Sequence, residues 1–192
     1  MANNINSKVS AVALDFDGVI ANLEIDWKNA IKQGSKTAGY DIRSLLLFYE
    51  ECFGTPIFQK VSSETEKIEL EALKKSQTVP YVAEFLHKLS EKNIEIYIVS
   101  MQSQRVIQTF LNQQGLNKYF KEIVTREQYP TKQAQVQYVA KTTSGKVLFV
   151  DDSKRNIENC KGLGVLSFYF ARNPEPKDAQ KAWRKLLDSI DS

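Results

Sequence analysis

The sequence predicts an α/β protein, a doubly wound parallel sheet with a small helical insert after its first strand. Two observations lead to this fold class. Short apolar segments rich in β-branched and aromatic residues recur along the 192-residue chain, and from the second onward they alternate with helical patterns. Runs such as VLFV at 147–150 are apolar throughout, which is typical of strands that helices cover on both faces. Together these features favour a Rossmann-like layered fold.

The expected strands are the segments 9–16, 94–99, 122–125, 146–151 and 165–170. Helical patterns fill the intervals, and several have recognisable ends. Pro80 lies in the first turn of a helix that reaches Glu91, and Gly115 ends another that starts near 103. Thr131 and Ser153 are placed as N-caps of two further helices. Apolar residues at helical spacing predict a last helix near the C-terminus.

Residues 22–79 depart from the alternation, because they show helical periodicity and no convincing strand. We expect helices near 27–38, 41–54 with Asp41 as N-cap, and 63–75. This insert starts at the loop after the first strand, the edge where parallel sheets place their ligands, so it is positioned to act as a lid. The predicted division is a core of residues 1–21 and 80–192 and an insert of residues 22–79.

Composition excludes several classes of protein. The net charge is +3 and both signs are interleaved along the chain, so a nucleic-acid partner is not expected. No apolar run approaches the ~20 residues of a membrane span. The two cysteines, Cys52 and Cys160, have no metal-site spacing, which is typical of a reduced compartment. We therefore expect a soluble, cytoplasmic protein.

Two acidic pairs follow apolar strands. Asp15 and Asp17 lie in DFDGV after the first strand, and Asp151 and Asp152 end the strand 146–151. Since the carboxyl ends of parallel strands share one edge, both pairs are expected to converge on one site. Repulsion between such carboxylates calls for a cation, and carboxylate oxygens are ligands that Mg²⁺ prefers. The alternative, that DFDG is an ordinary turn, would make the second pair a coincidence.

Taken together, these motifs resemble the haloacid dehalogenase superfamily of aspartate-nucleophile hydrolases. The resemblance rests on DxDGV at the first strand, Ser100 ending the second, a Lys at a helix start, and DDS ending the fourth. It covers essentially the whole chain, and the insert matches the location and helical character of the C1-type cap of that family. It implies a Mg²⁺-dependent phosphatase that acts on a small organic phosphate ester.

The resemblance also implies roles for the acids. Asp15 would be the nucleophile that becomes an aspartyl-phosphate, and Asp17 the general acid that later activates water. The Asp15 carboxylate, the Asp17 backbone carbonyl and the pair Asp151 and Asp152 would hold Mg²⁺. Alignment of DDS on the GDS form of the family favours Asp152 as the direct ligand.

Phosphate-binding residues follow from the same resemblance. Ser100 corresponds to the phosphate-binding Ser or Thr, and Met101 follows it where the family commonly has a small or polar residue. Lys132 corresponds to the lysine that opens the helix before the acidic strand. Lys141 and Arg126 are the other candidates for this cation.

Several functions are compatible with these motifs. Dehalogenases of this superfamily need no acid at the position of Asp17 and its transport ATPases carry Thr there, so the resemblance favours a phosphatase or a phosphomutase. A non-catalytic binding protein that has kept the fold is a further alternative, which the four strand-end carboxylates disfavour. A polynucleotide end phosphatase has little support, because no basic stripe is present.

Overall fold

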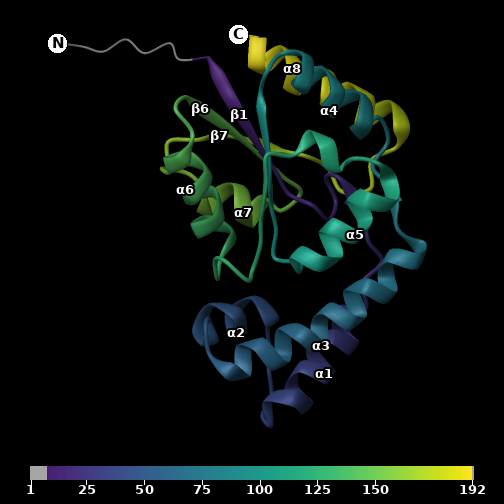
Figure 1. Cartoon of the computed structure of the whole chain (residues 1–192), viewed down its shortest axis with the longest axis vertical. Coiled ribbons are helices and arrows are strands. Elements are labelled where there is room, and N and C mark those ends of the chain that lie inside the picture. Colours follow the sequence, from purple (N-terminus) through teal and green to yellow (C-terminus); the bar gives the residue numbers. More distant parts are fainter. Residues whose placement is uncertain (1–7, 192) are drawn as a thin grey trace, which may run out of the picture.

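The computed structural model describes residues 8–191, and its centre is a sheet of five parallel strands (Figure 1). The strand order is β5-β4-β1-β6-β7. Their bounds are Val9–Leu14 for β1, Glu95–Val99 for β4, Glu122–Val124 for β5, Lys146–Asp151 for β6 and Leu166–Tyr169 for β7. The chain runs from β1 outward to β5 and then crosses to β6, so the direction of winding switches between β1 and β6. The predicted fold class is confirmed.

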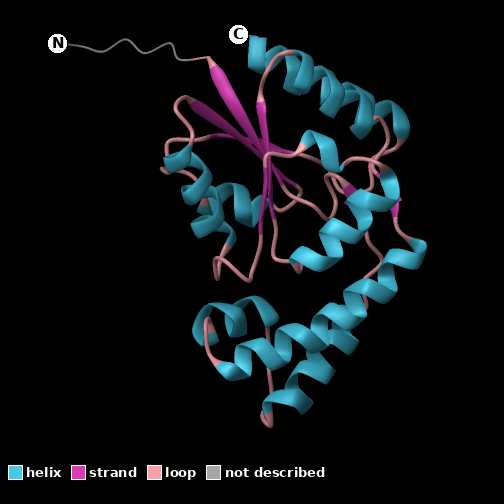
Figure 2. Ribbon diagram, in the orientation of Figure 1, coloured by secondary structure: helices cyan, strands magenta, loops and turns pink. Residues whose placement is uncertain are grey.

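Alternation along the strands supplies one hydrophobic cluster to each face of the sheet. In β1, Val12 and Leu14 face one cluster, whereas Ala11 and Ala13 face the other. Helices α4 (Val82–Glu91), α5 (Gln104–Gln114) and α8 (Pro176–Asp191) cover the first face, and α6 (Lys132–Thr142) and α7 (Lys154–Asn159) cover the second (Figure 2). No helix within residues 8–191 is both long and apolar enough to span a bilayer.

The insert consists of three helices, α1 (Trp27–Ala38), α2 (Leu45–Cys52) and α3 (Pro56–Ala72), followed by a 3-10 turn, η1 (Leu73–Lys75). A second short 3-10 turn, η2 (Asn117–Tyr119), lies in the core before β5. The three helices share a small aromatic-rich cluster that includes Phe48, Tyr49 and Phe58. Where the insert joins the core, β2 (Ala21–Asn22) pairs antiparallel with β3 (Gln77–Thr78). The two ends of the insert therefore lie side by side.

Details of the insert differ from the expectation. Ser44, and not Asp41, caps α2, because its hydroxyl accepts a hydrogen bond from the Leu47 N–H at 3.4 Å. Helix α3 starts earlier than expected, since Thr55 caps it and Pro56 occupies its first position. The two-residue strands β2 and β3 were not expected, because so short a segment leaves no periodic pattern.

A buried ion pair joins the insert to the core. Arg126 follows β5, and its guanidinium donates to Glu69 Oε1 of α3 at 2.6 Å through Nη1. Both side chains are fully buried. The same guanidinium donates to Ser62 Oγ at 2.9 Å and to the Met101 carbonyl at 2.8 Å, so its charge is compensated on several sides. Helix α3 is thus fixed to the core through Ser62 and Glu69.

Replacement of Arg126 by alanine should lower the free energy of unfolding by about 3–5 kcal/mol, because it leaves the Glu69 carboxylate buried without its partner. The matched control is Arg105→Ala, which removes a more exposed pair between α5 and α3, with 3.5 Å between Arg105 Nη1 and Glu66 Oε1. That change should cost less than about 1 kcal/mol. Urea unfolding measures both, and equal losses would contradict the importance of the buried pair.

Candidate active site

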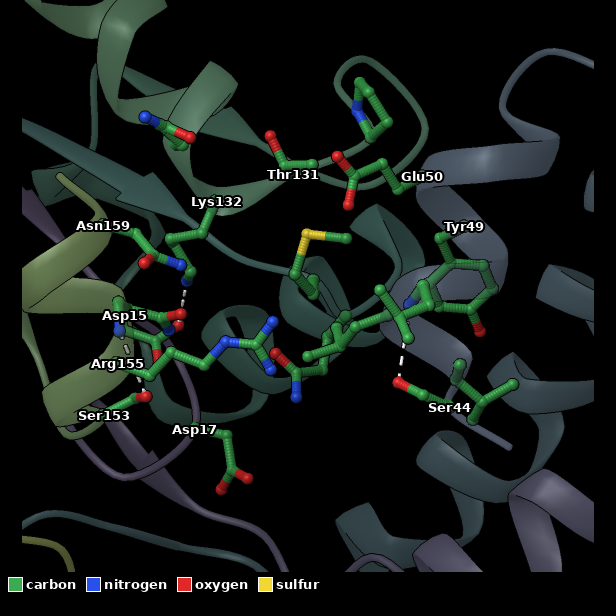
Figure 3. A pocket seen from close by; sticks show the side chains of 18 of the residues that line it. Asp15, Asp17, Ser44, Tyr49, Glu50, Thr131, Lys132, Ser153, Arg155 and Asn159 are labelled. Carbon is green, nitrogen blue, oxygen red and sulfur yellow. Dashed lines mark hydrogen bonds and ion pairs between the residues drawn. The ribbon is translucent and has the colours of Figure 1, made fainter. Parts of the chain in front are cut away.

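A pocket of about 630 Å³ lies between the carboxyl edge of the sheet and the insert (Figure 3). The core contributes acids and cations to it, and the insert contributes mainly α1, α2 and the loop before α2. Its position is next to the switch between β1 and β6, where α/β sheets of this kind place their ligands. Four predicted site residues with charged side chains line it: Asp15, Asp17, Lys132 and Asp152.

Lys132 holds the carboxylate of Asp15. Its Nζ donates to Asp15 Oδ1 at 2.6 Å and lies 3.6 Å from Asp151 Oδ2. Asp15 Oδ1 also accepts from the Phe16 N–H at 2.8 Å. Burial alone would lower the pKa of Lys132, but the charges of Asp15 and Asp151 outweigh it and raise the pKa above its ordinary value. The lysine is therefore a fixed cation at the floor of the pocket.

Local sequence explains why Lys132 reaches this place. Thr131 accepts a hydrogen bond from the Ala134 N–H at 3.1 Å and so caps α6, which starts at Lys132. The helix packs against β4 and β6 through Val136 and Val139, and its first turn lies at the carboxyl ends of these strands.

Three carboxylates form a cluster that fits a divalent metal ion. One oxygen each from Asp15, Asp151 and Asp152 lies within 4.8 Å of the others. Burial and then the charge of Asp15 raise the pKa of Asp151 to about 7, and the same two causes raise the pKa of Asp152. Asn156 orients Asp151 by donating from Nδ2 to both carboxylate oxygens, at 3.1 and 3.0 Å. Oxygen donors of this kind are the ligands of hard cations such as Mg²⁺.

Gly18 permits the close approach of the two acidic loops. Its φ of +94° lies in the left-handed region, and a Cβ built there would lie 2.2 Å from Asp152 Oδ2. Any side chain at this position would therefore displace the Asp152 carboxylate.

Asp17 and Asp152 share one arginine. Arg172, just after β7, donates from Nη2 to Asp17 Oδ2 at 2.6 Å and from Nη1 to Asp152 Oδ2 at 2.8 Å. The Leu23 N–H donates to the other oxygen of Asp17 at 2.9 Å. Burial raises the pKa of Asp17 to about 6, and the charge of Arg172 limits this rise. Asp17 thus lines the pocket beside Arg172, whose long side chain is partly exposed.

The structure does not bring the Ser100 hydroxyl to the pocket surface. Ser100 is fully buried, its hydroxyl donates to Gln102 Oε1, and its carbonyl accepts from Gln135 Nε2 at 2.8 Å. Met101 does line the pocket and also packs against the hydrophobic cluster of the insert. Asp151 lies behind the pocket surface, where its carboxylate faces Lys132.

The other candidates for the phosphate-binding cation lie elsewhere. Arg126 is engaged by Glu69 between insert and core. Lys141 is exposed in the last turn of α6, at the opposite end of this helix from Lys132. Lys132 is therefore the candidate that the fold places beside Asp15.

Among the residues that the sequence did not predict, Arg172 and Asn156 donate hydrogen bonds to the aspartates of the site. Arg172 lies shortly after the last strand, β7. It therefore shares an edge of the sheet with the acids, because residues after the carboxyl ends of parallel strands lie at one edge. The segment FYFARN carries this signal, because Arg172 comes shortly after an apolar strand. Asn156 lies one helical turn after the Ser153 cap, in reach of the preceding acid.

Comparisons with known proteins agree with this geometry. A search of curated protein sequences gave no match. Among solved structures, a haloacid dehalogenase-like hydrolase from Streptococcus pneumoniae is 14% identical, with a TM-score of 0.63 over 94% of this chain and 97% of that chain. A predicted phosphatase from Clostridium acetobutylicum is 14% identical, with a TM-score of 0.64 over 95% of this chain and 100% of that chain.

A third solved structure, a predicted phosphoglycolate phosphatase from Haemophilus somnus, is 17% identical, with a TM-score of 0.57 over 93% of this chain and 96% of that chain. At these identities the three structures show a shared fold. The sequence model of the haloacid dehalogenase-like hydrolases matches residues 12–170, which include every acid and cation of the pocket floor named above except Arg172. The chain belongs to the haloacid dehalogenase-like hydrolase family.

Proposed function

We propose that this hydrolase is a Mg²⁺-dependent phosphatase that cleaves a small organic phosphomonoester through an aspartyl-phosphate. The observation that carries the proposal is the environment of Asp15. Its Oδ1 accepts from Lys132 and from the Phe16 N–H, whereas its Oδ2 has no hydrogen-bond donor within residues 8–191. Oδ2 is thus the free oxygen of an oriented carboxylate that lines the pocket. The names of two similar structures, a predicted phosphatase and a predicted phosphoglycolate phosphatase, are consistent with this reaction.

The acid cluster would hold the metal ion. The carboxylates of Asp15, Asp151 and Asp152 are the proposed ligands, together with the backbone carbonyl of Asp17. When bound, Mg²⁺ supplies positive charge that lowers the repulsion between an attacking carboxylate and an anionic phosphate. Lys132 supplies further positive charge, since its Nζ contacts Asp15 directly.

The reaction proceeds in two steps. Asp15 Oδ2 attacks phosphorus, the bond from phosphorus to the ester oxygen breaks, and Asp17 donates its proton to the leaving alkoxide. Asp17, now a carboxylate, then takes a proton from water as the water oxygen attacks the aspartyl-phosphate. The bond between Asp15 and phosphorus breaks, which releases inorganic phosphate and restores both acids.

Arg172 must release Asp17 during this cycle. In the described structure its guanidinium donates to Asp17 Oδ2, and the Leu23 N–H donates to Oδ1, so both oxygens of this carboxylate are engaged. The arginine side chain is 43% exposed, so it can move without breaking the packed core. An incoming phosphate group offers it alternative anionic oxygens, and that exchange would free Asp17 for proton transfer.

The variant Asp15→Asn should lower kcat for p-nitrophenyl phosphate by about 10³-fold or more, because a carboxamide is a poor nucleophile. Its thermal unfolding should remain cooperative, since the strand packing is unchanged. The control Asp41→Asn alters an exposed acid of the insert and should leave kcat within about twofold of the wild type. Normal turnover by folded Asp15→Asn protein would overturn the mechanism.

Removal of divalent cations with EDTA should abolish hydrolysis, and added Mg²⁺ should restore it. Mg²⁺ should also raise the melting temperature of the wild type, because a ligand that binds only the folded state stabilises it. The variant Asp152→Ala should lose most of this shift, whereas Asp41→Ala should keep it. Full activity in EDTA, or an unchanged Mg²⁺ shift in Asp152→Ala, would contradict the proposed metal site.

A further inference from the structure

The insert presents an apolar wall to the pocket. Seven large hydrophobic side chains are strongly exposed among the described residues, and three of them line this pocket: Trp27, Leu46 and Leu47. Their exposed fractions are 40%, 49% and 48%. Apolar surface gathered on the wall of a concave site favours contact with an apolar part of a ligand.

Two arginines of the pocket have no acidic partner. Lys132 and Arg172 are both engaged by acids of the floor. Arg155 of α7 and Arg43, just before the α2 cap, make no hydrogen bond or ion pair within residues 8–191. Figure 3 shows the Arg155 side chain extending from α7 into the middle of the pocket, past Asp15. A free guanidinium aimed into a site is suited to bind a carboxylate or another planar anion.

The core side of the pocket, with Asp15 and Lys132, and the apolar wall of the insert would bind different parts of an ester. The phosphate would lie at Asp15 and Lys132, so the leaving group must extend toward the insert. A volume of about 630 Å³ leaves room for more than the phosphate and a two-carbon group. Glu50 is the acid that α2 adds to the lining, and it disfavours ligands with several negative charges on this side.

We infer that the substrate is a phosphomonoester whose leaving group has an apolar body and one further anionic group. The apolar body contacts Trp27, Leu46 and Leu47, and the anionic group is bound by Arg155, while Arg43 is the other unpaired guanidinium in the lining. This inference rests on the proposed function and adds the class of leaving group. It makes Arg155 a specificity-determining residue of the core.

Non-hydrolysable phosphonates test the inference by isothermal titration calorimetry in the presence of Mg²⁺. The probes are para-carboxybenzylphosphonate, benzylphosphonate without the carboxylate, and phosphonoacetate without the apolar body. The wild type should bind the first probe about tenfold or more tightly than either of the others. Arg155→Gln should reduce the preference over benzylphosphonate to within about twofold, since it removes the charge-assisted hydrogen bond. The double variant Leu46→Ser, Leu47→Ser should reduce the preference over phosphonoacetate.

Lys154→Gln is the matched control, because it removes the same charge one residue earlier on α7. The Lys154 Nζ lies 5.4 Å from the centre of the Tyr169 ring, and the residue is not part of the pocket lining. This variant should retain the full preference for the carboxylated probe. A similar loss in Lys154→Gln and Arg155→Gln would overturn the inference, because it would indicate a general effect of charge.

Hydrolysis of p-nitrophenyl phosphate by the same samples separates the two proposals. If the wild type hydrolyses this ester but binds both benzylphosphonates equally, the inference is wrong and the proposed function stands. If no turnover occurs at any Mg²⁺ concentration, the proposed function is wrong, and the class of leaving group falls with it. Turnover together with a carboxylate preference that depends on Arg155 supports both.

Discussion

Repulsion among carboxylates at one edge of the sheet is the constraint on which the site depends. Because β1 and β6 are neighbours, Asp15, Asp151 and Asp152 have oxygens within 4.8 Å of one another. Buried acids this close are costly unless positive charge or hydrogen-bond donors compensate them. The core supplies both from separate elements, with Lys132 at the start of α6 and Arg172 after β7. The strand order that brings the acids together therefore requires that other elements bring cations to the same edge.

The link between insert and core limits how the pocket can open. Glu69 lies in the second half of α3 and is buried against Arg126, whereas the apolar wall lies on α1 and α2, beyond that point. Leu23 and Leu73, near the two ends of the insert, pack in the main core. Detachment of α3 from the core would expose a buried charge, and α1 and α2 share a hydrophobic cluster with α3, so the insert is held to the core as one unit.

The sheet and the acid cluster could be predicted from the sequence because each depends on a strong local pattern. The strands are nearly continuous apolar runs, and the parallel arrangement then assigns the acids Asp15 and Asp152 to one edge. Contacts between distant segments left no such pattern. Nothing near Arg126 indicates that Glu69 is its partner, since 57 positions separate them. The burial of the Ser100 hydroxyl likewise depends on Gln102 and on packing, which side-chain spacing alone does not determine.

Most of the pocket lining that the insert supplies comes from one short stretch of chain. Residues 43–47, 49 and 50 all line the pocket, whereas Asp15, Asp17, Asp152 and Lys132 come from the core. A few nucleotide changes within one small part of the gene could therefore alter which ligand the pocket fits, while Asp15, Asp17 and Lys132 stay the same. Exchange of residues 43–50 between related chains would be a direct route to an altered choice of ligand.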